Sequence, residues 1–244
     1  MVVASHQGHY FPWLGYLDKM AKSDVFLIND VAQLEKQSPM VRNKILDRFG
    51  REKYLSVTID KSVDVTTLEN RQIALKDWRQ VSTLHQNLIK DSYRKALFFN
   101  EVYPEVEKLL DVDYGKLLDL QMATIELFRK WLRIETPLQF HSNMKYEQGA
   151  TTGERILKKL QSVNATIYLS GNGARKYMDN EIFEKNGISV IYQDFRYPIY
   201  GQVSSSTFVP NLSTLDMLFN TGIEESRRIF WKNVRSTHEL DNAR

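Results

Sequence analysis

The sequence contains no cysteine among its 244 residues. Disulfides, thiolate zinc sites and a cysteine nucleophile are therefore excluded. Long hydrophobic runs are also lacking, since no stretch approaches the roughly 20 apolar residues that a membrane-spanning helix needs. The N-terminal MVVASHQ has neither the basic region nor the apolar region of a signal peptide. These absences favour a cytoplasmic protein without a membrane span.

A strong excess of one charge is missing as well. The 33 basic and 30 acidic residues leave a formal net charge of +3. This small excess gives no strong nucleic-acid signal, although it tolerates an anionic substrate. We therefore expect a small-molecule partner that carries phosphate, and the sequence does not define an oligomeric state. The apolar fraction of 42% is that of an ordinary globular protein.

Short apolar runs alternate with helical patterns at both ends of the chain. Residues 1–5 (MVVAS) and 25–29 (VFLIN) predict buried strands, and helical apolar spacing between them completes a βαβ unit. Further strands are predicted at 54–59, 138–141, 166–170 and 188–193, and further helices at 152–160, 174–186 and 215–236. The pattern predicts an α/β fold with a parallel-rich sheet.

A mainly helical block interrupts this alternation in the middle of the chain. Residues 67–134 are mostly helical in pattern, most clearly at 114–134, where apolar residues line one side. The polar stretch 30–50 is predicted to be largely loop. We expect residues 1–244 to form a single α/β domain, with 67–134 as a helical subdomain.

Two histidines follow the first predicted strand, in SHQGHYFPWLGY (residues 5–16). Ligands bind at the carboxyl ends of strands in open parallel sheets, and an imidazole there can bind phosphate or transfer protons. The structural alternative is that one histidine caps a helix while the other packs against Trp13 or Tyr16. Position alone leaves both explanations open for His6 and His9.

The spacing of these histidines resembles the His-x-Gly-His element of class I nucleotidylyltransferases. Those enzymes usually carry a Gly-x-Phe-x-Pro stretch before it, where this chain has VVAS. Their downstream Ile-Ser-Ser-Thr-x-x-Arg element is imitated by VSSSTFVP (residues 203–210), but the arginine is absent. A nucleotidylyltransferase is therefore kept as an alternative function.

Polar residues at other predicted strand ends and loops are candidates for the same site. A turn after residues 166–170 contains Gly171 and Gly173, whose backbone N–H groups can approach a phosphate, although a lone Gly-x-Gly is weak evidence and a plain turn explains it better. Arg42 offers a planar fork for phosphate, and Asn43 can bind an amide or hydroxyl. Solvated surface is the alternative for this pair.

Two more histidines complete the candidates. His85 lies seven residues after Trp78 on a predicted helix, so that the two share a face and line either a pocket or the core. His141 ends a predicted strand and can join the same cavity. No spacing among the histidines is diagnostic of a metal, so no metal site is predicted.

Taken together, blocks along the chain resemble the WbqC-like protein family. HQGHYFPWLGYLDKMAKSDVFLIND resembles its N-terminal signature, and VRNKI and YLSVTI resemble an Asn-Arg-Asn-Arg/Lys-Ile element and a strand. ERIL, YLSGNGARKYMD, GISVIYQDFRYPIY and FVPNLSTLDMLFNTG match its C-terminal half. The resemblance spans about residues 1–225. Gly8, Val41 and Asn172 depart from the family pattern, and Gly8 makes the His-x-Gly-His lettering a feature of this chain.

The resemblance implies a transferase that acylates or aminoacylates an amino sugar, nucleotide-activated, or a related metabolite in surface-polysaccharide (O-antigen) or tailoring pathways. A non-catalytic binding or assembly protein of such a pathway is a further alternative. No cofactor is predicted beyond an activated acyl or aminoacyl donor. His6 and His85 are the candidate catalytic residues. The candidate substrate-binding residues are Gln7, Tyr10, Trp13, Arg42, Asn43, Ser170, Gly171, Asn172 and Gly173, with His9 and His141 as further members.

Overall fold

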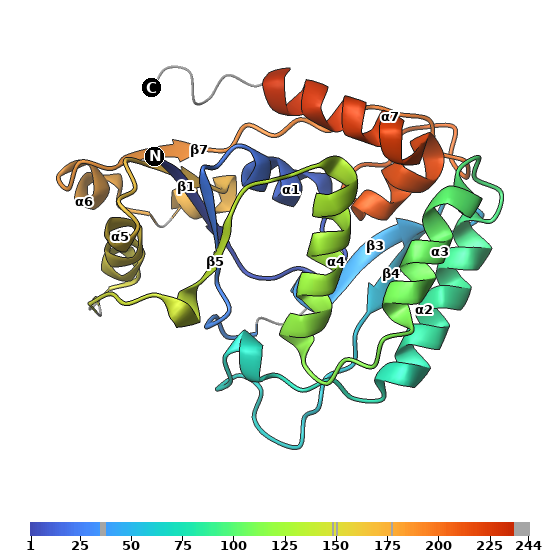
Figure 1. Cartoon of the computed structure of the whole chain (residues 1–244), viewed down its shortest axis with the longest axis horizontal. Helices are drawn as coiled ribbons and strands as arrows, with labels where there is room; N and C mark the ends of the chain where they lie inside the picture. Colours follow the sequence, from blue (N-terminus) through green and yellow to red (C-terminus); the bar gives the residue numbers. More distant parts are fainter. Residues whose placement is uncertain (35–37, 148, 150, 177, 237–244) are drawn as a thin grey trace.

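The main sheet of the protein has five parallel strands and lies toward the side of the molecule that carries the N-terminus (Figure 1). The structure is a computed structural model that describes residues 1–34, 38–147, 149, 151–176 and 178–236. The sheet has the order β5-β2-β1-β6-β7, and every neighbouring pair is parallel. Its strands are β1 (Val2–His6), β2 (Val25–Ile28), β5 (Leu138–Phe140), β6 (Ile167–Ser170) and β7 (Ser189–Tyr192). The predicted α/β fold with a parallel sheet is confirmed.

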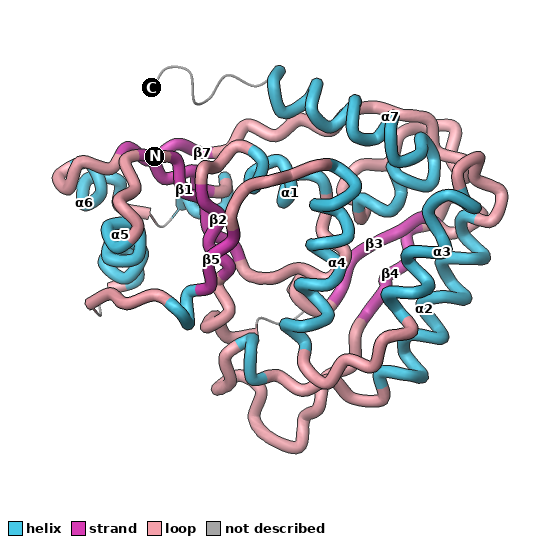
Figure 2. Tube along the Cα trace, in the orientation of Figure 1, coloured by secondary structure: helices cyan, strands magenta, loops and turns pink. Residues whose placement is uncertain are grey.

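Helices cover both faces of this sheet, as buried parallel strands require (Figure 2). Val2 and Ala4 of β1 belong to a core with α1 (Leu14–Ala21), α4 (Leu117–Leu132) and α7 (Thr214–Ser236). Val3, which points to the opposite face, packs with α5 (Thr152–Ser162) and α6 (Asn180–Glu184). Side chains that alternate along a strand therefore reach two different layers.

The predicted helical block is present and lies beside the α1 face of the sheet (Figure 1). It consists of α2 (Trp78–Tyr93), α3 (Phe99–Leu110) and α4, whereas the segment before Trp78 contains only the short 3-10 helix Asn70–Gln72. Its apolar side chains share one core with α1, α7 and the sheet. Gly222 kinks α7 with a φ of 77°, and a Cβ there would lie 2.6 Å from the Phe98 ring.

A separate antiparallel hairpin corrects the prediction for residues 30–59. β3 (Arg42–Leu46) falls in the stretch expected to be loop, and β4 (Glu52–Ser56) lies earlier than the strand expected at 54–59. The hairpin buries Ile45, Leu46 and Leu55 but leaves Glu52 and much of β4 exposed. Its apolar signal is therefore too short to distinguish a strand from a loop.

The helix predicted at 174–186 is also divided. A 3-10 helix, Asn172–Lys176, is followed by the separate α6. The Asp179 side chain accepts a hydrogen bond from the Glu181 backbone N–H and thus starts a new helix. Within the residues that the structure describes, no helix is both long and apolar enough to cross a membrane.

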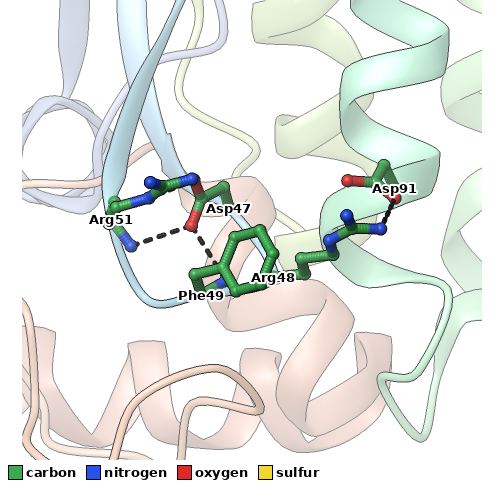
Figure 3. Close-up of polar contacts among 5 residues, drawn as sticks. All are labelled: Asp47, Arg48, Phe49, Arg51 and Asp91. Atoms are coloured by element: carbon green, nitrogen blue, oxygen red, sulfur yellow. Dashed lines mark hydrogen bonds and ion pairs between the residues drawn. The ribbon is translucent and has the colours of Figure 1, made fainter.

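The turn of the hairpin is organised by one buried carboxylate, that of Asp47 (Figure 3). Its Oδ1 accepts hydrogen bonds from the backbone N–H groups of Phe49 (2.9 Å) and Arg51 (3.0 Å). Its Oδ2 accepts one from Arg51 Nε at 2.9 Å. Burial alone would raise the pKa of Asp47, but these hydrogen bonds outweigh it and lower the pKa. Arg48 pairs with Asp91 of α2 at 3.0 Å, and both side chains are about half exposed.

We expect Asp47→Asn to lower the free energy of unfolding by about 1–3 kcal/mol at pH 7, because charge-assisted hydrogen bonds are lost. A carboxyl whose folded-state pKa is depressed stabilises the fold above its unfolded pKa of about 3.9, and this contribution is lost as pH falls through the folded pKa. Denaturant unfolding at pH 7, 5 and 3 measures this. The difference should persist at pH 5 and shrink at pH 3.

The matched control is Asp91→Asn, which removes an exposed ion pair of the same turn. It should cost no more than about 1 kcal/mol at any pH. An equal loss in both variants, or a loss in Asp47→Asn that does not depend on pH, would contradict this account of the turn.

Candidate functional site

The strand order changes direction between two adjacent parallel strands, β1 and β6. From β1 it continues through α1 to β2 on one side, and from β6 it continues through α6 to β7 on the other. Such a switch point opens a crevice beyond the carboxyl ends of the strands, where ligands of open α/β sheets bind. A cavity of about 340 Å³ lies there, lined at the end of β1 by Ser5, His6 and Gln7 and after β6 by Ser170, Gly171 and Gly173.

A second cavity, of about 1060 Å³, adjoins the first. The two share the lining residues Asn29, His141, Ile156 and Lys159, and we call them together the switch-point cleft. The charged residues that line it are Lys19, Glu69, Arg71, Lys145, Arg155 and Lys159. Five basic side chains thus line the cleft with one carboxylate, and that carboxylate already pairs with Arg71 at 2.7 Å. The cleft is electropositive and suited to an anionic ligand.

A hydrogen-bonded group centred on His141 lies where the two cavities meet. His141 Nε2 is 3.2 Å from Ser5 Oγ, and His141 Nδ1 is 2.9 Å from Asn29 Oδ1. Lys159 Nζ of α5 lies 3.0 Å from the same Nδ1. Ser5, Asn29 and His141 come from the ends of β1, β2 and β5, three neighbouring strands (Figure 2).

The position and protonation of His141 are fixed by its surroundings. The buried carboxylate of Asp30, which follows β2, accepts hydrogen bonds from the backbone N–H (3.0 Å) and the hydroxyl of Ser142. This holds the 3-10 helix His141–Asn143 against the end of β2. Burial, together with the charge of Lys159, lowers the pKa of His141 to about 3. The imidazole is therefore neutral at physiological pH.

A second buried group lies on the α1 side of the cleft. The rings of His6 and His9 are 4.6 Å apart, and each also contacts Tyr16. Within the described chain, Nδ1 of both histidines and the Tyr16 hydroxyl are buried without a hydrogen-bond partner. Burial lowers the pKa of His6 well below its usual value and that of His9 to about 3, with a contribution from Lys19.

Lys19 is an unusual cation for a cleft wall because it is almost fully buried. Its Nζ donates a hydrogen bond to the Ser5 carbonyl oxygen at 2.9 Å. Burial lowers the pKa of Lys19 to about 7. Near physiological pH, about half of the protein molecules therefore carry Lys19 in its neutral form. A group that titrates there can give or take a proton during a reaction.

The structure brings together one subset of the predicted site residues, namely His6, Gln7, Ser170, Gly171 and Gly173 with His141. Asn172 is beside them but exposed, and its amide donates a hydrogen bond to the Gln193 carbonyl oxygen at 2.7 Å. This hydrogen bond ties together the ends of β6 and β7. All the predicted residues that line the cleft thus lie at or just after the carboxyl ends of strands.

The structure places Trp13, Arg42 and Asn43 in a different cavity, of about 230 Å³. Arg42 and Asn43 belong to β3 rather than to the predicted loop. Asn43 Nδ2 donates to the Phe11 carbonyl oxygen (2.6 Å), and its Oδ1 accepts from the Lys44 backbone N–H (2.8 Å). Because Phe11 has a positive φ of 43°, Asn43 serves to hold a strained corner.

Tyr10 and His85 form a pair in the core. The Tyr10 hydroxyl lies 2.9 Å from His85 Nδ1, both side chains are buried, and neither lines the switch-point cleft. His9 is likewise buried behind His6. Val203 and Ser204, from the stretch that imitates the second nucleotidylyltransferase element, line another cavity beside Arg48. The two elements of that alternative therefore do not converge.

Sequence reasoning missed Ser5, Lys19, Asn29 and Lys159. Ser5 and Asn29 had a usable signal, since each is a polar residue at the carboxyl end of a strand that was predicted. Lys19 and Lys159 had none, because a lysine in an amphipathic helix normally faces solvent.

Comparison with known proteins places the chain in a family. The model of the WbqC-like protein family matches residues 7–228. A protein of Mycobacterium tuberculosis (strain ATCC 25618 / H37Rv), called "Uncharacterized protein Rv1507c", is 30% identical over 224 residues, which cover 91% of this chain and 94% of that protein. None of the solved structures matches significantly. The chain belongs to the WbqC-like protein family, as the resemblance predicted.

We expect His6, His9 and His141 to remain neutral between pH 5.5 and 8, because burial lowers all three pKa values. Nitrogen-15 NMR of the histidine rings measures this directly. The unfolded chain takes up protons near pH 6.5, so the free energy of unfolding should fall as pH is lowered from 7 to 5. Titration of any of the three near pH 6.5 in the folded protein would contradict the described burial.

Proposed function

We propose that the protein is a transferase that moves an acyl or aminoacyl group from an activated donor onto the amine of a phosphate-bearing small molecule. The switch-point cleft is the proposed site. An amino sugar carried on a nucleotide is the acceptor class that fits both the cleft and the resemblance to surface-polysaccharide and tailoring proteins. The observation that carries the proposal is the meeting of a cationic cavity with a smaller cavity lined by neutral imidazoles and hydroxyls.

The larger cavity suits the phosphates of such an acceptor. Lys145 and Arg155 line it, and Arg155 presents a planar fork that matches phosphate oxygens. The smaller cavity supplies groups that bind hydroxyls and amides, namely Gln7 and Ser170. Gly171, which lines the smaller cavity, supports the presence of a ligand there. A Cβ at this position would meet no atom within 4 Å, and Gly171 does not have a positive φ. Neither packing nor backbone strain requires glycine at 171, so its lack of a side chain leaves room for a ligand.

The proton chemistry of amide formation fits the residues of the smaller cavity. An amine at neutral pH is mainly an ammonium ion, whose nitrogen cannot attack a carbonyl until one proton leaves. His6 lines this cavity with a ring that burial keeps neutral, and this ring takes that proton. Lys19, which titrates near pH 7, lies beside it and can accept the proton in turn.

Binding is tested by thermal shift with uridine diphosphate amino sugars, coenzyme A thioesters, aminoacyl donors and nucleoside triphosphates. A ligand at a hundredfold excess over its Kd stabilises the folded protein by about 2.7 kcal/mol. We expect the nucleotide amino sugar and one acyl donor class to raise the Tm. Arg155→Ala should weaken binding of the sugar nucleotide about tenfold or more, since a charge-assisted hydrogen bond contributes about 1.5–3 kcal/mol.

Lys158→Ala is the matched control, because Lys158 lies on the same helix but pairs with Glu147 and lines neither cavity. Its Kd should be unchanged. Stabilisation by triphosphates alone, with release of pyrophosphate, would instead support the nucleotidylyltransferase alternative. Stabilisation by none of the four classes would leave the proposal without its ligand and would contradict it.

Turnover is tested with His6→Gln. We expect amide formation to fall about 100-fold at pH 7, the lower end of the usual effect of a general base. The deficit should shrink toward pH 9, because the acceptor amine then loses its proton to water. His85→Gln is the comparison, since its ring lies outside the cleft, and the folded fraction of this variant should keep its turnover. Full activity of His6→Gln at pH 7 would remove His6 from the reaction.

A further inference from the structure

The hydrogen bonds around His141 hold a serine, a histidine and an asparagine in series. Ser5 Oγ faces Nε2, and Asn29 Oδ1 faces Nδ1 on the other side of the ring. An imidazole that donates from one nitrogen to an oriented acceptor and accepts a hydroxyl proton at the other is the arrangement that activates a serine. Ser5 lines the smaller cavity, the part of the cleft where we place a bound donor.

Lys159 makes a contact with His141 that is not required for activation of Ser5. Its Nζ lies 3.0 Å from Nδ1, the nitrogen that also faces Asn29. In a neutral imidazole one nitrogen is a donor and the other an acceptor. When the Lys159 ammonium donates to Nδ1, the ring proton resides on Nε2 and is donated to Ser5 Oγ, and His141 cannot take the serine's proton. When Lys159 withdraws, Nδ1–H donates to Asn29 and Nε2 becomes the acceptor.

The position of Lys159 provides a reason for it to withdraw. Lys159 lines both cavities of the cleft, and the larger one also presents Arg155 and Lys145. A phosphate held by these cations attracts the Lys159 ammonium away from a neutral ring, because the ion–ion attraction exceeds that of an ammonium for an imidazole. The charge of Lys159 also lowers the pKa of His141, so its withdrawal makes the ring a stronger base.

We propose that Ser5 is a nucleophile that carries the acyl group as an ester, and that Lys159 keeps it inactive until a phosphate occupies the larger cavity. The inference rests on the proposed function for its donor and acceptor, and it adds a covalent intermediate and a switch to that function. The groups are positioned independently of any ligand, since the Asn29 backbone N–H donates to the His6 carbonyl oxygen at 2.8 Å and Asp30 holds Ser142.

The proposed transfer consists of two half-reactions. Ser5 Oγ attacks the carbonyl carbon of an acyl thioester or activated ester, its proton passes to His141 Nε2, the bond to the leaving group breaks, and the leaving group takes that proton. The amine nitrogen of the acceptor then attacks the serine ester, and its proton passes to Nε2. The bond between carbon and Oγ breaks, and Oγ recovers the proton. The products are an amide, the free thiol or alcohol and unmodified Ser5.

The experiment measures modification of the intact protein by an alkyl fluorophosphonate, which esterifies activated serines with loss of fluoride. Inorganic pyrophosphate is the occupant of the larger cavity. In the wild-type protein we expect slow labelling at Ser5 that becomes about tenfold faster with pyrophosphate. Lys159→Met, which keeps the length of the side chain without its charge, should label fast without pyrophosphate and should not respond to it. Peptide mass spectrometry locates the modified residue.

The controls separate activation from folding. Lys158→Met, one position away on α5, should behave as the wild type. Ser5→Ala should not be labelled, and Asn29→Ala should label slowly even with pyrophosphate. Lys159→Gln provides a second neutral variant should Lys159→Met fail to fold, and the Tm of each variant is compared with that of the wild type. Absence of labelling at Ser5 in folded wild-type and Lys159 variants, or labelling that ignores pyrophosphate in the wild type, would overturn the proposal.

The outcome is distinguishable from that of the proposed function. If amide formation is observed and Ser5→Ala retains it, transfer is direct and the covalent step is wrong while the transferase stands. If Ser5 is labelled under control of pyrophosphate but no amine is acylated by any donor, the serine site stands and the transferase is wrong.

Discussion

Parallel pairing of β1 with both β2 and β6 is the constraint on which the site depends. The pairing brings the ends of three chain segments to one edge, and a hydrogen bond from the Asn29 N–H to the His6 carbonyl oxygen at 2.8 Å extends the pairing of β1 with β2 past the end of β2. Side chains alternate along a strand, so a slip of one residue would send Ser5 to the α1 face and His6 to the α5 face. The register therefore decides which side chains enter the cleft.

The same edge buries groups that a protein interior normally excludes. His9 and Lys19 are buried there, and Nδ1 of both His6 and His9 has no hydrogen-bond partner among the described residues. A buried polar group without a partner costs about 1–3 kcal/mol. The surrounding structure is held firmly enough to tolerate them. Gln193, for example, donates hydrogen bonds both to the Gly15 carbonyl oxygen and to Asp18, which ties α1 to the end of β7. Destabilising groups that persist in an anchored site are consistent with selection for chemistry rather than for stability.

Much of this arrangement was predictable from the sequence, for physical reasons. The βαβ unit and the helical block have long, periodic apolar patterns, and the rule that ligands meet strand ends selected His6, Gln7 and the turn at 170–173. The pairing of Ser5 with His141 was not predictable, because the two lie 136 positions apart and only the strand order brings them together. β3 was missed and β4 was expected too late in the chain, because few side chains of this hairpin are buried.

The contrast between two histidines shows why residue type alone misleads. His85 and His141 both lie in segments with periodic apolar residues, and each ring has a hydroxyl within hydrogen-bond distance. His85 sits on a helix face that turns into the core, where the Tyr10 hydroxyl satisfies it. His141 sits where a strand ends, and a loop begins there that can face a ligand. His6 likewise ends a strand and lines the cleft, whereas His9 does not, so position at a strand end indicated the cleft better than residue type did.

The position of Lys159 answers a requirement that the proposed reaction imposes. A transferase must deliver an activated acyl group to an amine in the presence of water, which is far more abundant than the acceptor. A serine that is reactive in the empty cleft would pass the donor to water. When an ammonium holds the neighbouring imidazole in the unreactive tautomer, the serine becomes reactive only as the acceptor's phosphate arrives, so that the acceptor is already in the cleft when the ester forms. In the proposed reaction the charge of Lys159 thus has two effects, since it adds to the attraction of Arg155 and Lys145 for phosphate and also protects the donor.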